Sequence, residues 1–334
     1  MNKITKIGVT SGDLNGVGLQ ILIQSFNKIF KQNKNLKLIL FASKFALRFY
    51  LNFLKIDGVN YNVIEDIEDA EFETINIFDC FKSDLIINPG VVTKDSGLAA
   101  SQSLNIASDY LVSNKINALV TMPVNKSNMF FEKGVQFIGH TEYLRDKSKA
   151  KETLMILIAK ELKVATVTNH IPISKVSSAL TKKLLSSKID ILINSLRADF
   201  LIDSPKIAVL GLNPHMGDNG LIGKEEEGVI KPTIQKFIEK DFNVSGPFSS
   251  DAFFGKSLFK NYDAVLSMYH DQGLIPFKMK SFNQGVNYTA GMGFIRTSPD
   301  HGPAHDIVGS NVVKINSFLN AVLWSDKIYK SRLV

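Results

Sequence analysis

Three of the six histidines share one local pattern, because each stands at the end of a short apolar run. VATVTNH ends at His170, IAVLGLNPH at His215 and AVLSMYH at His270. Side chains at the ends of neighbouring parallel strands reach one common crevice, so we expect the three imidazoles to lie close together. Three neutral imidazoles suit a divalent ion such as zinc and leave positions open for a substrate. The spacings match no short metal motif, and any one histidine alone fits a hydrogen-bonded strand end.

Two carboxylates and a fourth histidine lie in similar settings. Asp271 directly follows His270, and Asp251 lies in GPFSSDAFF. Either carboxylate could orient a ligand imidazole or bind the ion, although Asp251 fits a helix cap equally well. His140 and Thr141 in FIGHTEYL offer a hydrogen-bonding pair, for which a structural role and substrate contact both stay open.

Glycine-rich segments are candidates for binding an anion. GVTSGDLNGVGLQ passes through Gly12, Gly16 and Gly18 into a predicted helix, so its backbone N–H groups could face a phosphate or carboxylate. This spacing is not the dinucleotide fingerprint. NPHMGDNGLIGKEEEG is not a P-loop either, because Lys224 is followed by Glu225 rather than Ser or Thr.

Cations follow the last of the three histidines. KMKSFNQGVNYTAGMGFIRTS interleaves glycines with Lys278, Asn287 and Arg296, which could together hold a doubly charged anion. The alternative is a twisted hairpin with solvated cations. Only five arginines occur in the chain, so Arg296 is a candidate for a bidentate anion clamp. The next segment, DHGPAHDIVG, adds polar groups whose capping and catalytic roles the pattern does not separate.

The elements that position these residues are short apolar runs rich in Ile, Val and Leu. They alternate with stretches of helical periodicity over 98–111, 181–196 and 228–238. This alternation predicts an α/β fold with a largely parallel sheet, in which ligands bind beyond the carboxyl ends of the strands. At 334 residues the chain exceeds the usual size of a single core, which favours two domains.

Composition excludes several classes of protein. Hydrophobic residues make up 45% and charged residues 21%, which excludes disorder as the general state. The net charge of +7 comes from lysines spread along the chain without a basic stripe, so we expect no nucleic-acid partner. No apolar stretch is long enough for a bilayer and no signal peptide is present, which predicts a cytoplasmic protein. Cys80 is the single cysteine, so no internal disulfide or Cys-based metal cluster can form.

Ordered blocks of the sequence resemble the 4-hydroxythreonine-4-phosphate dehydrogenase family, NAD-dependent enzymes of pyridoxal 5'-phosphate (vitamin B6) biosynthesis. The blocks are GHTE, GLNPH with its glycine-rich loop, DAVLSMYHDQG and GVNYTAGMGFIRTSPDHG followed by DIVG. The resemblance implies the fold of the isocitrate and isopropylmalate dehydrogenases, with two α/β/α domains flanking a cleft. We expect the first domain at 1–138 plus 300–334, and the second, with the metal and substrate residues, at 139–299. The first loop departs from the family's usual form, since GDLNGVGLQ lacks its proline and its final acidic residue.

The resemblance also implies roles for individual residues. The family's metal ligands fall on the same three histidines, and the ion is expected to be shared between the subunits of a homodimer. The expected catalytic residues are Asp251, Asp271 and Lys126. The expected substrate contacts are His140, Thr141, Lys278, Asn287 and Arg296.

The implied reaction is oxidation of 4-phosphohydroxy-L-threonine to 2-amino-3-oxo-4-phosphohydroxybutanoate, which decarboxylates to 3-amino-2-oxopropyl phosphate. The expected oxidant is NAD, with NADP as the alternative. The ion, one of Zn, Mg, Co or Mn, would lower the pKa of the alcohol. One alternative is a related dehydrogenase acting on another phosphorylated hydroxy acid. A phosphate acetyltransferase-like enzyme has a similar fold but needs no metal, and the three strand-end histidines argue against it. A non-enzymatic protein with structural histidines is the third alternative.

Overall fold

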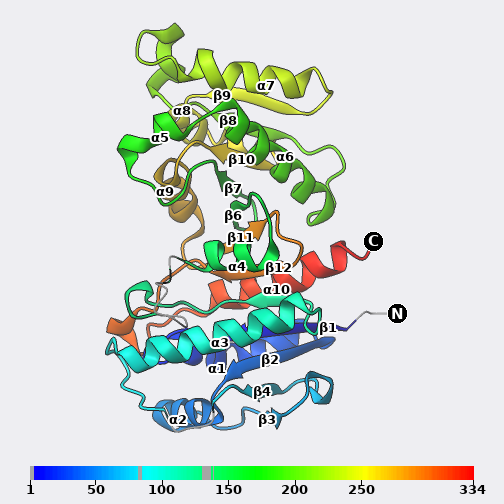
Figure 1. Ribbon diagram of the computed structural model, residues 1–334, viewed down its shortest axis with the longest axis vertical. Helices are drawn as coiled ribbons and strands as arrows, with labels where there is room; N and C mark the ends of the chain where they lie inside the picture. Colours follow the sequence, from blue (N-terminus) through cyan, green and yellow to red (C-terminus); the bar gives the residue numbers. More distant parts are fainter. Residues whose placement is uncertain (1–3, 82–84, 130–136, 138) are drawn as a thin grey trace. The chain divides into compact units, whose positions relative to one another are not determined.

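The computed structural model describes residues 4–81, 85–129, 137 and 139–334, and it confirms the α/β class (Figure 1). Two compact units form, Met1–Ala150 with Met292–Val334, and Lys151–Gly291. These boundaries differ from the predicted ones at both ends. Helix α4 (His140–Ser148) packs on α3, and strand β12 (Ile295–Pro299) pairs with β5, so both belong to the first unit.

Six strands of the first unit lie side by side in the order β3-β4-β2-β1-β5-β12. Each of these strands is parallel to its neighbours within the unit. Strand β2 (LKLILFA) is buried except at Lys37, as expected for a parallel sheet covered on both faces. The other strands are β1 (Thr5–Thr10), β3 (Tyr61–Ile64), β4 (Ile75–Asp79) and β5 (Ala118–Val120), while β2 spans Leu36–Ala42.

Helices α1, α3 and α10 pack against the strands or against one another in this unit. Helix α3 begins after Thr93, whose hydroxyl accepts a hydrogen bond from the Ser96 N–H and so caps the first turn. The helices are α1 (Gly18–Gln32), α2 (Lys44–Leu54), α3 (Lys94–Val112), α4 and α10 (Asn316–Ser331), with 3-10 turns η1 (Ile67–Asp69), η2 (Lys126–Asn128) and η8 (His305–Ile307).

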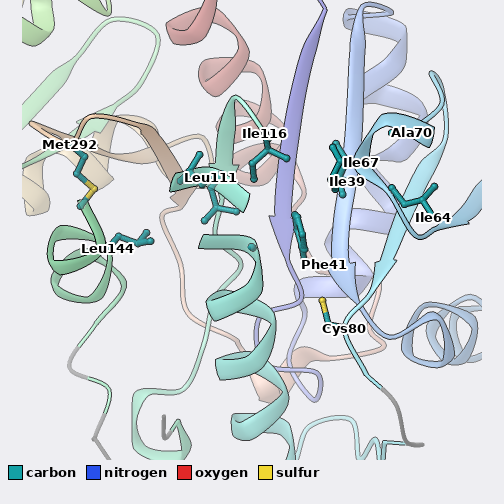
Figure 2. Close-up of a cluster of buried hydrophobic side chains, with 12 residues drawn as sticks. Ile39, Phe41, Ile64, Ile67, Ala70, Cys80, Leu111, Ile116, Leu144 and Met292 are labelled. Carbon is teal, nitrogen blue, oxygen red and sulfur yellow. The ribbon is translucent and has the colours of Figure 1, made fainter. Parts of the chain in front are cut away.

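A buried apolar cluster joins strand β2 to helices α3 and α4 in the first unit (Figure 2). Phe41 of β2 and Leu111 of α3 belong to it, as does Leu144, which is fully buried on α4. Because α4 begins at His140, the burial of Leu144 fixes the helix that carries this candidate residue.

The second unit contains a mixed sheet in the order β11-β6-β7-β10-β8-β9. Strands β7, β10, β8 and β9 are parallel, so their carboxyl ends meet at one edge. Strand β6 is antiparallel to both of its neighbours, β11 and β7. Its pairing with β7 follows from the short turn between the two strands, in which the Ala159 N–H donates to the Leu162 oxygen. The strands are β6 (Leu154–Ile158), β7 (Lys163–Thr166), β8 (Ile207–Leu210), β9 (Val244–Phe248), β10 (Ala264–Ser267) and β11 (Val286–Ala290).

The helical segments of the second unit follow these strands. Helix α9 packs on β7 and β10, α6 packs on β6 and β11, and α7 packs on β9. Their bounds are α5 (Val176–Ala179), α6 (Lys182–Ala198), α7 (Lys231–Ile238), α8 (Ser250–Gly255) and α9 (His270–Ser281), with shorter turns η4 (Ile173–Lys175), η5 (Pro214–Gly220), η6 (Glu226–Ile230) and η7 (Leu258–Asn261). Among the described helices, none combines the length and apolar character needed to cross a membrane.

Candidate functional site

Four neighbouring parallel strands of the second unit each end shortly before one predicted site residue. His170 follows β7, His270 follows β10, His215 follows β8 and Asp251 follows β9 on helix α8. Since these strands run side by side in the order β7-β10-β8-β9, the four side chains emerge along one edge of the sheet. The strand-end pattern of the sequence therefore corresponds to one edge of the fold.

His170 and His270 are neighbours in the structure. Their ring centroids lie 5.9 Å apart, beside a cavity of about 250 Å³ that both residues line. The Nδ1 atom of His270 lies 2.6 Å from Oδ1 of Asp271. When the carboxylate accepts the Nδ1 proton, Nε2 of His270 keeps its lone pair and can bind a metal ion.

His215 and Asp251 form a second pair. The Ser249 hydroxyl donates to the Asp251 carboxylate at 2.5 Å. This bond, the Ala252 amide and the charge of His215 lower the pKa of Asp251. The N-cap position of α8 belongs to Ser249 rather than to Asp251, so Asp251 stands in the first helical turn. The predicted alternative of an N-cap role for Asp251 is therefore wrong.

The donor types of these two pairs fit a borderline divalent ion, since imidazole nitrogens and a carboxylate are its usual protein ligands. The orientation of His270 by Asp271 also fits, because metal-binding histidines normally give their second nitrogen to such a partner. Within the described residues, however, no three His, Cys, Asp or Glu side chains gather closely enough to hold an ion.

Gln272 links three of the segments that lead to these residues. Its side-chain amide donates to the Gly211 carbonyl oxygen at 2.6 Å and to the Ser250 hydroxyl at 2.8 Å. Its Oε1 accepts the Met268 N–H at 2.6 Å. The three partners precede His215, Asp251 and His270 respectively along the chain. The sequence analysis missed Gln272, although it lies inside the block MYHDQG that carried the resemblance.

Two predicted substrate residues also lie in the second unit. Lys278 stands on the exposed last turn of α9. Asn287 lies on β11, and its Oδ1 atom is buried with no hydrogen-bond partner among the described residues. A buried polar atom in this state can accept a hydrogen bond from a ligand at little desolvation cost.

Arg296 is the centre of a second set of candidate residues, in the first unit. It lies on β12 with 3% of its surface exposed. Both Nε and Nη2 donate to the hydroxyl of the buried Thr121, at 3.0 and 2.7 Å. Burial lowers the pKa of Arg296 to about 10, while the nearby carboxylate of Glu142 raises it. Thr121 directly follows β5, and no feature of the sequence pattern identified it.

His140 begins helix α4 and is electrostatically coupled to this arginine. Burial, followed by the charges of Arg296 and Lys126, holds its pKa well below the ordinary value, so the imidazole is neutral at pH 7. Its Nε2 is buried with no hydrogen-bond partner among the described residues. Thr141 follows in the first turn of α4. Two cations, the Glu142 carboxylate and a neutral imidazole thus give the first unit a site with a net positive charge, which suits an anion.

The glycine-rich segment after β1 does not offer its amides to an anion as predicted. Its residues 11–18 are buried, and the N–H groups of Ser11 and Asn15 donate to the side-chain oxygens of Ser103 and Asp13. The Asp13 N–H donates to the Pro123 oxygen and the Val17 N–H to the Pro303 oxygen. The segment therefore anchors neighbouring loops. Asp13 also lies 3.3 Å from Nε2 of His305, which gives that histidine of DHGPAHDIVG a structural contact.

Comparison with known proteins gives a consistent result. The family model described as "Pyridoxal phosphate biosynthetic protein PdxA" matches residues 34–325. A 4-hydroxythreonine-4-phosphate dehydrogenase of a Sulfurihydrogenibium species is 38% identical over 324 residues, covering 96% of this chain and 97% of the relative. A putative D-threonate 4-phosphate dehydrogenase of Oceanobacillus iheyensis is 35% identical, with coverage of 96% and 97%.

Solved structures agree with these relatives. The crystal structure of 4-hydroxythreonine-4-phosphate dehydrogenase from Klebsiella pneumoniae superimposes with a TM-score of 0.83 at 31% identity, covering 98% of this chain and 99% of that one. A terephthalate 1,2-cis-dihydrodiol dehydrogenase from Burkholderia xenovorans, at 20% identity and a TM-score of 0.64, shares the fold. The chain therefore belongs to the PdxA family of pyridoxal phosphate biosynthetic proteins, as an oxidoreductase of the dehydrogenase class.

Proposed function

We propose that the protein oxidises the C3 hydroxyl of 4-phosphohydroxy-L-threonine with NAD and a divalent metal ion. The alcohol becomes a ketone, one hydride passes to the nicotinamide ring and one proton leaves. The product, 2-amino-3-oxo-4-phosphohydroxybutanoate, then loses carbon dioxide to give 3-amino-2-oxopropyl phosphate. The observation that carries this proposal is that His170, His270, His215 and Asp251 follow the carboxyl ends of four neighbouring parallel strands, in a chain whose relatives are dehydrogenases.

The three histidines would hold the ion, which supplies a Lewis acid that lowers the pKa of the substrate alcohol. Asp271 acts through His270, because its contact with Nδ1 keeps the ring in one tautomer and one orientation. Asp251 is ionised at neutral pH, since hydrogen bonds from its neighbours lower its pKa. It can therefore accept a proton or complete the ligand set beside His215.

Arg296, Lys126 and Lys278 would bind the phosphate and carboxylate groups of the substrate. The neutral His140 can donate or accept a hydrogen bond without adding charge, and Asn287 offers a buried acceptor. Thr141 adds a hydroxyl beside His140. Such contacts orient the alcohol for hydride transfer, which is the chemistry of the cofactor itself.

We further propose that the enzyme works as a cytoplasmic homodimer with the metal site shared between subunits. An exposed apolar patch supports this: Ile275 and Met279 on helix α9 and Phe282, the residue that follows the helix, are 58%, 81% and 73% exposed. The helix begins at His270, so a second copy packed on this patch would lie near the paired imidazoles.

D-threonate 4-phosphate is the competing substrate, because a relative named for it is as similar to this chain as several named for the amino acid. The two substrates differ in that a threonate carries a hydroxyl where threonine carries an ammonium group. Both belong to the same reaction class, so fold and metal ligands do not distinguish them.

The test measures reduction of NAD and NADP with each substrate, after chelation and after return of Zn, Mg, Mn or Co. We expect the threonine phosphate with NAD to give the highest kcat/KM, and chelation to abolish the rate. If NAD or NADP is reduced with D-threonate 4-phosphate but not with the threonine phosphate, D-threonate 4-phosphate is the substrate. Full activity after exhaustive chelation would contradict the metal site.

A further inference from the structure

The loop that carries His215 has an unusual backbone. From His215 to Asn219 every residue has a positive φ angle, between 43° and 77°. This left-handed conformation is disfavoured for residues that carry a Cβ atom, and a run of five is rare. Only Gly217 in this run lacks a Cβ, so contacts from elsewhere must hold the loop in place.

The side chain of Glu226 supplies those contacts. It is fully buried at the start of the turn η6. Its Oε1 accepts the backbone N–H groups of Leu212 and Asn213, both at 2.7 Å. Its Oε2 accepts the Asn213 side-chain amide at 2.9 Å. The bonded residues stand two and three positions before His215.

Two glycines make room for this arrangement. A Cβ atom on Gly217 would lie 2.7 Å from Oε2 of Glu226, and one on Gly223 would lie 2.3 Å from the amide nitrogen of Asn213. The loop therefore closes around the Glu226 carboxylate and the Asn213 amide. From the sequence, the segment NPHMGDNGLIGKEEEG was interpreted only as not being a P-loop, and no role was predicted for Glu226.

We propose that Glu226 is a positioning residue, which holds the left-handed loop so that the imidazole of His215 is presented for metal binding. The proposal rests on the metal dependence proposed above. Glu226 is fully buried and contacts the backbone at two points just before His215, so it acts through His215. Buried carboxylates that fix a ligand-bearing segment in this way commonly change metal affinity by about 10–100-fold when removed.

The test compares Glu226→Gln with Glu227→Gln, the same chemical change one residue along. Glu227 is partly exposed and pairs only with Lys231 in the described contacts, so its variant controls for lost charge. In metal-free protein we expect hydrogen–deuterium exchange over 212–223 to speed up at least tenfold in Glu226→Gln and to stay unchanged in Glu227→Gln. Equal exchange in the two variants would overturn the proposal.

Titration with Co²⁺, followed by its visible absorption, gives the second readout. We expect Glu226→Gln to weaken Co²⁺ binding about 10–100-fold, with kcat recovering at high metal concentration. Faster exchange without weaker Co²⁺ binding would reduce Glu226 to a structural residue and overturn the proposal. If the wild-type protein binds no Co²⁺, the metal-dependent function itself fails, and the exchange data still decide whether Glu226 holds the loop.

Asn213→Ala keeps the test valid if Glu226→Gln does not fold. This variant removes the amide that bonds to Oε2 but leaves both backbone bonds to Oε1. We expect a smaller increase in exchange and a smaller loss of Co²⁺ affinity than for Glu226→Gln. Wild-type values for both in a folded Asn213→Ala protein would contradict the proposal.

Discussion

The side-chain amide of Gln272 donates to the carbonyl oxygen of Gly211 at 2.6 Å, which joins helix α9 to the end of strand β8. The same amide reaches Ser250. One side chain therefore sets the spacing of three loops that bear site residues. Small errors in such spacing are costly, because a metal site tolerates displacements of only a few tenths of an ångström.

Gln272→Glu should disrupt this spacing. A carboxylate has no hydrogen to donate to Gly211 or Ser250. Its negative oxygen would also be repelled by the carbonyl oxygen of Gly211. We expect a loss of about 1–3 kcal/mol in the free energy of unfolding and about 10–100-fold weaker metal binding. Chemical denaturation and Co²⁺ titration measure these changes. Gln235→Glu on the exposed side of α7 is the matched control, and an equal effect there would contradict the special role of Gln272.

Thr121→Val removes the hydroxyl that accepts both guanidinium donors of Arg296 and keeps the side-chain shape. A hydrogen bond to a charged group contributes about 1.5–3 kcal/mol, so KM for the phosphorylated substrate should rise about tenfold or more. Steady-state kinetics give the values of KM and kcat. Thr121→Ser retains the hydroxyl and should restore most of the affinity; no difference between the two variants would refute this role.

His140 gives stability a specific pH dependence. Its folded-state pKa lies below the ordinary value of 6.5. Just below pH 6.5, His140 is therefore protonated in the unfolded chain but still neutral in the folded protein. Stability is therefore fully present above pH 6.5 and falls as the pH drops below it, by up to about 1.4 kcal/mol per pH unit. Denaturation of the wild type and of His140→Asn between pH 5 and 8 should show this slope only in the wild type. Parallel curves would be inconsistent with a neutral buried His140.

Asp271→Asn should weaken the metal site without unfolding the protein. The Asn amide no longer holds His270 in the tautomer with a free Nε2, and second-sphere carboxylates of this kind affect metal affinity by about 10–100-fold. Asp271 is largely exposed, so the midpoint of thermal unfolding should hardly change. Metal analysis after dialysis and a thermal melt provide the comparison. Asp190→Asn changes an exposed residue of α6 and is the control, which should retain wild-type metal content.

Met279→Glu places a charge on the exposed apolar face of α9. We expect this change to separate the proposed homodimer into monomers, which would also lose metal affinity if the site is shared. Light scattering on a sizing column gives the mass of the particle. Lys280→Glu introduces a similar charge at the next residue of the helix, outside the apolar face, and should leave the dimer intact. A monomeric wild-type protein with full activity would disprove the shared site.

Local sequence patterns predicted much of the fold. The apolar runs before His170, His215 and His270 are strands β7, β8 and β10, because unbroken runs of branched residues suit buried parallel strands. Strand β6 was missed, together with its antiparallel pairing, which depends on the turn before Leu162. The site prediction thus rested on the histidines at the strand ends. No sequence pattern predicted the distances between these histidines.

Other features depend on contacts between distant segments. The N–H groups after β1 were predicted to face an anion, but partners such as Pro123 and Pro303 lie more than a hundred residues away. Thr121 and Glu226 escaped notice for the same reason, since their roles come from what folding places beside them. His215, Asp218 and Asn219 are residue types that adopt left-handed backbone more often than most, whereas Met216 is not. Such single-residue preferences do not predict a run of five residues with positive φ.

The first unit is assembled from two separated stretches of chain. Strand β12 and helix α10 are synthesised after the whole of the second unit, and until then β5 is paired only with β1. A ribosome-bound chain would therefore hold a finished second unit while the first still exposes an unpaired strand edge. Delay in translating Met292–Val334 would lengthen that exposure, and with it the time available for aggregation.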